Sequence, residues 1–460
     1  MSPTDSMFLI PESRDQPMHV GSLQLYRRPP DAPEGYLVDA YEELLKADDD
    51  IYRDFRKRPY RSLRTLGQWA WAEDAEVDLE HHIRHSALPQ PGRIRELLAL
   101  VSRLHSTLLD RHRPLWEMHL IEGFEDGERF AIYTKMHHAM MDGVSGLRLV
   151  ARALSTDPQE QGPIAWFSTE VNERRRSSGG GESKAGSGLL SLPVSTARGL
   201  ADLVGVGTTA ARVAERALRE QRAAMPMQAP RSILNTGITG ARRFAADSWS
   251  MDRIRTVGKA TGTTMNDVVL AMCAGALRTY LLELGELPDA PLIAMTPVSL
   301  RHGESDGGNA VGTILCNLAT DLDDPAERLA AVHESMRIGK DTLAGLNQLQ
   351  ATALSALMMA PVVATLSSAT ASSVLPPAYN LVISNVPGPQ VPLYFRGAQL
   401  EGLYPLSIPT NGQALNITLT SYNGNLEFGL IGCRRRVPHL QRLLTHLEDS
   451  LAELEKAVGV

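Results

Sequence analysis

A long segment of unusual composition divides the chain, and this segment limits the possible folds more than any other feature. Between residues 158 and 231 the sequence is rich in Ser, Gly, Ala and Arg, with almost no pattern typical of strands. Such a composition is typical of a linker, although residues 196–224 regain helix-forming residues and predict one or two helices. We therefore expect two folded halves, residues 1–157 and 232–460, joined by a flexible and helical linker over residues 158–231.

Both halves show helix and strand patterns in alternation, which predicts an α/β (α+β) fold. The expected helices cover residues 97–110, 267–282 and 440–454, and the expected strands cover residues 130–135, 292–295 and 380–384. A hairpin is predicted near the end of the chain, where Leu415–Tyr422 and Leu426–Ile431 flank Asn423-Gly424. This dipeptide favours the positive φ angles of a tight turn.

The composition argues against several classes of function. The chain has 46 basic and 53 acidic residues and a net charge of −7, so its surface repels nucleic-acid phosphates. The three cysteines have no disulfide or zinc spacing, and we expect no metal. Cys273 lies in an apolar run and is interpreted as a small buried residue.

No membrane-targeting segment is expected from the sequence. The first ten residues lack the basic start of a signal peptide, and the longest apolar stretch, residues 351–371, is interrupted by Pro361 and by many Ser and Thr residues. We interpret that stretch as a buried or tunnel-lining segment. These features favour a cytoplasmic protein.

The segment that most clearly suggests catalysis is His137-His138-Ala-Met-Met-Asp142-Gly143, between a predicted strand and a predicted helix. Side chains alternate along an extended chain, so only one of the two histidines can enter a given cleft. A neutral histidine can take a proton from an attacking hydroxyl. The simpler alternative is a core histidine followed by Asp142 capping the helix, with Gly143 permitting a backbone conformation barred to other residues. A second pair, His81-His82, lacks the following Asp-Gly and is assigned no catalysis.

Several short segments resemble one family. His137-His138-x-x-x-Asp142-Gly143 resembles the HHxxxDG motif of coenzyme A-dependent acyltransferases. The following segments, in the same order as in the family, resemble motifs of bacterial wax ester synthase/diacylglycerol acyltransferases: Pro114-Leu115-Trp116, Asn266-Asp267, Pro297-Val-Ser-Leu-Arg301 and Asn385-Val386-Pro387-Gly388-Pro389. The opening Ser2–Phe8, His19-Val-Gly and the segment from Gly412 also resemble the family, so the likeness covers nearly the whole chain.

This resemblance implies two chloramphenicol-acetyltransferase-like domains, with mixed sheets flanked by helices and a tunnel between the domains. It implies that His138 is the general base, that His137 supports it, and that Asp142 and Gly143 are structural. The remaining candidates for binding or shaping the site are Asn266, Asp267, Leu115, Trp116, Asn385, Pro387 and Gly388.

Each of these remaining candidates also has a structural alternative. Asn266 could donate to an oxyanion, but Asn266-Asp267 could equally cap the helix that follows. Leu115 and Trp116 could line an acyl tunnel or belong to the core. Asn385–Pro389 could shape the tunnel or simply form a rigid turn at a strand end. A basic run, Arg53 to Arg64, could contact coenzyme A phosphates or an anionic membrane, or be a solvated surface.

The resemblance implies acyl transfer from long-chain acyl-CoA to diacylglycerol, giving triacylglycerol, with no tightly bound cofactor. Wax ester synthesis from long-chain fatty alcohols is the alternative within the family. A noncatalytic lipid-binding or lipid-droplet protein is the alternative from another class. Oily substrates also predict peripheral contact with a membrane or lipid droplet.

Overall fold

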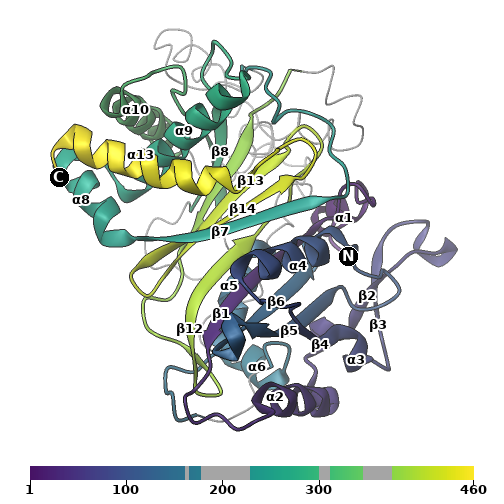
Figure 1. Cartoon of the computed structure of the whole chain (residues 1–460). Coiled ribbons are helices and arrows are strands. Elements are labelled where there is room, and N and C mark those ends of the chain that lie inside the picture. The colour runs from purple at the N-terminus through teal and green to yellow at the C-terminus, as the bar shows by residue number, and fades with distance from the viewer. Residues whose placement is uncertain (161–164, 178–227, 300–310, 345–375) are drawn as a thin grey trace.

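A computed structural model describes residues 1–160, 165–177, 228–299, 311–344 and 376–460. The predicted helices within residues 196–224, the apolar stretch 351–371 and Arg301 lie outside these described residues. Two six-stranded sheets form the centres of two lobes (Figure 1). We call these the first lobe, which contains the N-terminus, and the second lobe, which contains the C-terminus.

The first sheet has the strand order β11-β12-β1-β6-β5-β4. Its strands are β1 (His19–Arg27), β4 (Ile83–Ala87), β5 (Trp116–Phe124), β6 (Arg129–His137), β11 (Tyr394–Phe395) and β12 (Ala398–Leu406). β4 and β5 are parallel and the other pairs are antiparallel. The helices that accompany this sheet are α1 (Pro3–Leu9), α2 (Tyr36–Leu45), α3 (Leu79–His82), α4 (Ile94–Ser106), α5 (Gly143–Arg152) and α6 (Thr169–Ser177).

The second sheet has the strand order β7-β14-β13-β10-β8-β9. Its strands are β7 (Arg242–Ser250), β8 (Ile293–Ser299), β9 (Val311–Asn317), β10 (Leu381–Val386), β13 (Leu415–Tyr422) and β14 (Asn425–Cys433). Four helices accompany it: α8 (Met251–Thr261), α9 (Met265–Leu284), α10 (Pro325–Ala344) and α13 (Arg442–Val458). β10 is parallel to both β8 and β13, so the predicted mixed sheet is confirmed.

Both faces of β13 and β14 are covered. The leucine stripe of α13 and the apolar helix α9 pack on one face in one hydrophobic core. β12 lies against the other face, and the approach is closest at Gly429, where an added Cβ would lie 1.8 Å from the Pro405 carbonyl oxygen. The hairpin prediction is confirmed, because Asn423 and Gly424 have φ angles of 44° and 86° between the two strands.

The prediction for the end of α4 was wrong. The helix ends at Ser106 and the backbone of Thr107 is extended, so Leu108 lies outside the helix that was expected to reach Asp110. The reason is a contact distant in sequence: the Lys135 ammonium group donates to the Leu104 and Thr107 carbonyls at 3.2 and 3.0 Å.

Two observations bear on the predicted division of the chain. β11 and β12, from the C-terminal half, complete the first sheet by pairing β12 with β1. Trp166 and Phe167, from the segment predicted as linker, are buried in the core of the first lobe. The boundaries at residues 157 and 231 stay a prediction. The first lobe, however, contains two strands from the C-terminal half of the chain.

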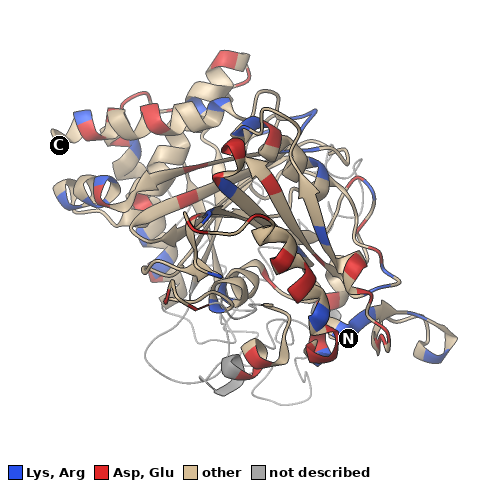
Figure 2. Cartoon of the chain, turned by 60° about the horizontal axis from the view of Figure 1, so that its bottom comes forward, with Lys and Arg blue, Asp and Glu red and all other residues tan. Residues whose placement is uncertain are grey.

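Figure 2 shows acidic and basic residues distributed over the helices and strands of both lobes. No helix among the described ranges is long and apolar enough to cross a membrane.

Candidate active site

The His137-His138 pair lies where a central strand of the first sheet ends. β6 ends at His137, and a turn then leads to α5, whose N-cap residue is Asp142. The backbone N–H of His138 donates to the Met18 carbonyl at 2.9 Å, just before β1 begins. The pair is therefore held by the backbone of two neighbouring strands.

The imidazole of His138 is half-buried beneath an aromatic ring from the N-terminal helix. The rings of Phe8 and His138 stack with centroids 3.9 Å apart and an interplanar angle of 19°. Burial lowers the pKa of His138 to about 4; the Asp142 charge opposes this effect and the His137 charge adds to it. His138 is therefore neutral at physiological pH and able to accept a proton.

The side chain of His137 is fully buried in different surroundings. Its Nδ1 accepts a hydrogen bond from the Ala139 N–H at 3.0 Å, so the proton of the neutral ring is on Nε2. Nε2 lies 3.2 Å from Glu12 Oε1, and the other oxygen of this carboxylate lies 2.7 Å from Arg111. Burial would raise the pKa of Glu12, but His137 and Arg111 together lower it. The Ala139 N–H therefore fixes the tautomer of His137, and the Glu12 carboxylate lies at ion-pair distance from its Nε2.

Asp142 caps α5, as the simpler interpretation predicted. Its carboxylate accepts hydrogen bonds from the Ser145 N–H at 2.9 Å and from the Ser145 hydroxyl at 2.8 Å. The prediction for Gly143 was wrong, because it has no left-handed φ angle and an added Cβ would be 3.8 Å from Val20, an ordinary contact. As the first helical residue of α5, it has a backbone conformation open to any residue.

Two predicted residues from the second lobe lie together. Asn266, in the first turn of α9, accepts a hydrogen bond of 3.4 Å from the side chain of Asn385 on β10. Neither Asn266 nor Asp267 is the N-cap, which is Thr264; Asp267 instead completes the capping box by accepting from the Thr264 N–H. The buried Asp267 carboxylate also lies 2.8 Å from Nδ1 of His333 on α10.

The Asn385–Pro389 segment continues from the end of β10. The strand ends at Val386, and the Gly388 N–H donates to the Ser421 hydroxyl at 3.0 Å. A Cβ on Gly388 would lie 2.2 Å from the Ser421 carbonyl oxygen, so only glycine fits there. Pro387 is exposed beside this contact.

Leu115 and Trp116 are both completely buried. Trp116 is surrounded by aromatic rings, with centroids 5.1 Å from Trp166 and 5.0 Å from Phe167, and its indole N–H donates to the Phe55 carbonyl. Leu115 packs with Ala139 and other residues beneath the histidine turn. These are the surroundings of core residues, while contact with an acyl chain stays a prediction.

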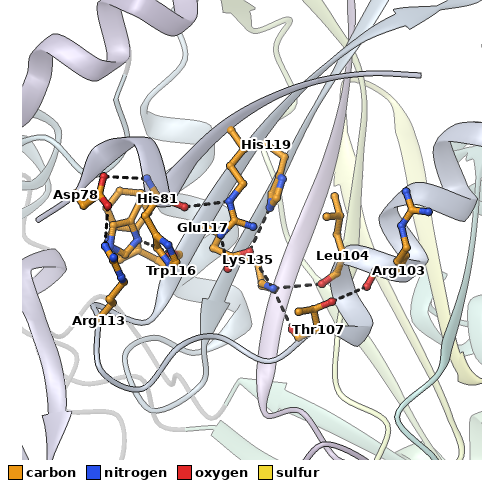
Figure 3. Close-up of polar contacts among 12 residues, drawn as sticks. Asp78, His81, Arg103, Leu104, Thr107, Arg113, Trp116, Glu117, His119 and Lys135 are labelled. Carbon is orange, nitrogen blue, oxygen red and sulfur yellow. Dashed lines mark hydrogen bonds and ion pairs between the residues drawn. The ribbon is translucent and has the colours of Figure 1, made fainter. Parts of the chain in front are cut away.

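A buried ion cluster supports the strand that leads to the histidines (Figure 3). Lys135, two residues before His137 on β6, is fully buried, and its ammonium group lies 3.0 Å from the Glu117 carboxylate. Glu117 also contacts His119 at 3.2 Å and Arg84 at 3.4 Å. Burial by itself would raise the pKa of Glu117, but its hydrogen bond with His119 and the charges of Lys135 and Arg84 lower it to about 2.

The predicted residues gather in two places, the histidine turn and the Asn266–Asn385 pair. Within the part of the chain that the structure describes, no hydrogen bond or ion pair joins these places. Sequence reasoning missed Phe8, Glu12 and Arg111, which surround the two histidines. The likeness of Ser2–Phe8 to the start of a known family was the only signal for that region.

Family models match most of the chain. The wax ester synthase/diacylglycerol acyltransferase catalytic domain matches residues 1–269, and the C-terminal domain of the same family matches residues 307–455. The probable diacylglycerol O-acyltransferase tgs2 of Mycobacterium tuberculosis is 52% identical, covering 100% of this chain and 99% of that protein. The O-acyltransferase WSD of Acinetobacter baylyi is 44% identical, covering 100% and 97%.

Solved structures have the same fold. The wax ester synthase/diacylglycerol acyltransferase from Marinobacter aquaeolei matches with a TM-score of 0.77 and 43% identity over 100% of both chains. The first condensation domain of the CDA synthetase matches with a TM-score of 0.57 at 16% identity, covering 100% of this chain and 95% of that one. The second likeness concerns the fold alone.

Proposed function

The chain belongs to the wax ester synthase/diacylglycerol acyltransferase family of acyl-CoA-dependent O-acyltransferases, and on this premise we propose that it esterifies diacylglycerol to triacylglycerol with His138 as general base. Long-chain acyl-CoA is the donor, used as a co-substrate. The preference for diacylglycerol rests on the names of the mycobacterial relatives. Wax ester synthesis from a long-chain alcohol uses the same chemistry and is the alternative.

The observation that carries the proposal is the contrast between the two adjacent histidines. His137 has its Nε2 3.2 Å from the Glu12 carboxylate, whereas His138 is neutral, half-buried and stacked on an apolar ring. Among the described residues, the side chain of His138 has no hydrogen bond or ion pair with a carboxylate, and Asp142 acts on it only through its charge. Glu12 and Arg111 act through His137, as positioning residues that hold the turn.

The reaction follows from a neutral imidazole at this position. His138 takes the proton of the acceptor hydroxyl while the oxygen attacks the thioester carbonyl and forms a tetrahedral oxyanion. The oxyanion then collapses, the carbon–sulfur bond breaks, and the imidazolium returns the proton to the thiolate. Transfer is direct, and no acyl-enzyme is formed. We assign Asn266 and Asn385 to shaping the site, with their side-chain amides as candidate oxyanion donors.

The experiment is a thiol-release and ester-product assay with palmitoyl-CoA and either diacylglycerol or a long-chain alcohol. We expect His138→Ala to lower kcat by about 10² to 10⁴-fold, because proton transfer from the acceptor hydroxyl is lost. His112→Ala is the matched control, since His112 has a side chain 91% exposed.

Three results of this assay would contradict parts of the proposal. Full activity of a folded His138→Ala variant would exclude His138 as the base. No turnover by the wild-type protein, despite tight lipid binding, would favour the noncatalytic lipid-binding alternative. Turnover with the long-chain alcohol but not with diacylglycerol would make the alcohol the acceptor, and the proposed mechanism would stay the same.

A further inference from the structure

A small hairpin of the first lobe projects from the molecule and carries the two most exposed large apolar side chains among the described residues. Strands β2 (Lys57–Tyr60) and β3 (Ala70–Glu73) form this hairpin, which extends beyond the first sheet (Figure 1). At its tip, the side chains of Leu63 and Leu66 are 94% and 88% exposed. Exposed leucines are costly in water unless another surface covers them.

The tip is an ordered turn. The Ser62 hydroxyl accepts a hydrogen bond from the Arg64 N–H, and the Ser62 carbonyl accepts one from the Gly67 N–H at 3.0 Å. Leu66 has a φ angle of 51°, a left-handed conformation that is rare for a bulky residue. The turn therefore holds both leucines on an already folded support.

The hairpin is positively charged, although the whole chain has a net charge of −7. Between residues 57 and 73 the sequence contains Lys57, Arg58, Arg61 and Arg64 and one acidic residue, Glu73. In Figure 2 the hairpin projects to the right of the N-terminus and carries basic residues. Charge of this sign close to exposed apolar groups matches a surface with anionic headgroups above an apolar layer.

Aromatic residues connect the hairpin to the histidine turn. Trp69 and Trp71 are half-buried and pack on the cluster that contains Leu9, Leu115 and Ala139, which Phe8 also contacts. The guanidinium groups of Arg61 and Arg111 lie 5.1 and 5.5 Å from the Trp69 ring.

Arg111 is also the ion-pair partner of Glu12, so the hairpin is contiguous with the residues that hold His137. Packed apolar and aromatic side chains therefore link Trp69 and Trp71 of the hairpin to the candidate active site.

We propose that the β2–β3 hairpin docks the protein on an anionic lipid surface, with Leu63 and Leu66 inserted among the acyl chains and Arg61 and Arg64 on the headgroups. In this arrangement Trp69 and Trp71 are placed at the membrane–water interface, where aromatic side chains are favoured. The choice of a lipid surface, rather than a protein, rests on the charge of the hairpin and on the oily substrates of the proposed function. Docking at this place presents the membrane to the histidine turn.

The test is flotation of the full-length chain with vesicles of phosphatidylcholine, with and without phosphatidylserine. We expect the wild-type protein to partition more strongly onto the anionic vesicles. Leu63→Ser with Leu66→Ser should lower the partition coefficient on both vesicles by at least about tenfold per leucine. Arg61→Gln with Arg64→Gln should lower it by roughly fivefold per arginine, on the anionic vesicles only.

Matched controls come from the second lobe. Leu282→Ser, at a leucine 52% exposed in α9, and Arg434→Gln with Arg435→Gln, at exposed arginines, should leave flotation unchanged. Transfer from a short-chain acyl-CoA to a water-soluble alcohol should be unchanged in every hairpin variant. This activity checks that the variants fold and that the site is intact.

The docking proposal is overturned if the wild-type protein floats with neither vesicle, or if the leucine variant floats as the wild type does. It is also overturned if light scattering detects a dimer that the leucine substitutions dissociate while flotation is unchanged, since the tip would then contact a second copy. A wild-type protein that floats but makes no ester would refute the proposed function and support docking.

Discussion

The stacking of Phe8 on His138 helps to set the pKa of the imidazole, and with it the pH range in which His138 can accept a proton. The aromatic ring removes one face of the imidazole from water, and burial disfavours its charged form. Without this cover, water would stabilise the imidazolium. The environment of His138 therefore depends on the N-terminal helix, which lies more than a hundred residues away in sequence.

We predict that Phe8→Ala raises the pKa of His138 from about 4 toward the ordinary histidine value of 6.5. The acidic limb of the kcat/KM profile should move to higher pH, so that the variant loses more activity at mildly acidic pH than at alkaline pH. Phe8→Leu, which keeps an apolar cover, should shift the limb less. An unchanged limb in Phe8→Ala would show that the stacking does not set this pKa.

Gly143, predicted to be structural, and Gly388, predicted to bind substrate or shape the site, differ sharply in what surrounds them. We predict that Gly143→Ala leaves the free energy of unfolding unchanged or raises it by up to about 1 kcal/mol, since alanine favours a helix. Gly388→Ala should lower it by about 1–3 kcal/mol, because its Cβ would lie 2.2 Å from the Ser421 carbonyl oxygen. Urea unfolding measures both. Equal losses in the free energy of unfolding would mean that the space around the Cβ does not decide whether alanine is tolerated at these two positions.

At the scale of elements, a buried ion cluster joins α4 to the central strands. Lys135 on β6 pairs with Glu117 on β5 and donates to the carbonyls at the end of α4 (Figure 3). Burial lowers the pKa of Lys135, and the Glu117 charge opposes this effect. Charged groups in the interior are stable only while each has its partners.

We predict that Lys135→Met lowers the free energy of unfolding by about 3–5 kcal/mol, because Glu117 loses its buried cation and the Leu104 and Thr107 carbonyls at the end of α4 lose the ammonium donor. The double variant with Glu117→Gln should lose less than the sum of the two single losses. Lys259→Met, at an exposed lysine of α8, is the control and should change stability by less than about 0.5 kcal/mol. Additive losses in urea unfolding would argue against an energetic coupling between Lys135 and Glu117.

At the scale of the whole molecule, buried neutral histidines make stability depend on pH. Burial lowers the pKa of His82 to about 4 and that of His105 to about 3, and it also lowers the pKa of His19. The unfolded chain binds protons at these histidines from an ordinary pKa of 6.5 downward, whereas the folded chain does not. Stability must therefore fall as the pH decreases from 6.5 toward 4.

One buried carboxyl acts in the opposite direction. Burial raises the pKa of Glu427 from 4.5 to about 7. Between these two pH values the folded state therefore holds a proton that the unfolded state has released. Three histidines with a pKa near 3 or 4, His82, His105 and His138, oppose this one carboxyl, so unfolding takes up about two protons net, and His19 adds to the same direction. This corresponds to stability falling by on the order of 3 kcal/mol per pH unit below about pH 6.

We predict that the thermal midpoint decreases steadily between about pH 7 and pH 5, before most surface carboxylates are protonated. His105→Gln should make this decrease less steep, because one of the protons that favour unfolding is removed. His112→Gln, at an exposed histidine, should leave the slope unchanged. A midpoint independent of pH over this range would contradict the inferred protonation states.

The sequence by itself determined the features that depend on neighbouring residues. Asn423-Gly424 adopts the positive φ angles of a hairpin turn because its own backbone permits them, and Asp142 caps α5 because Ser145 lies three residues away. The apolar run from Asp267 predicted a buried helix for the same reason. The sequence also predicted that His138 lies between a strand and a helix, because the spacing of apolar residues changes there from a strand pattern to a helix pattern.

Only the tertiary structure decided the contacts between distant segments. The end of α4 depends on Lys135, β12 joins the first sheet from the other half of the chain, and Phe8 and Glu12 reach the two histidines from the N-terminus. No local pattern encodes such contacts, because they arise when packing brings the surfaces of separate elements together. The sequence therefore predicts a role for His138 as a base, while the contacts of Phe8 and Glu12 with the histidine pair became visible only in the folded chain.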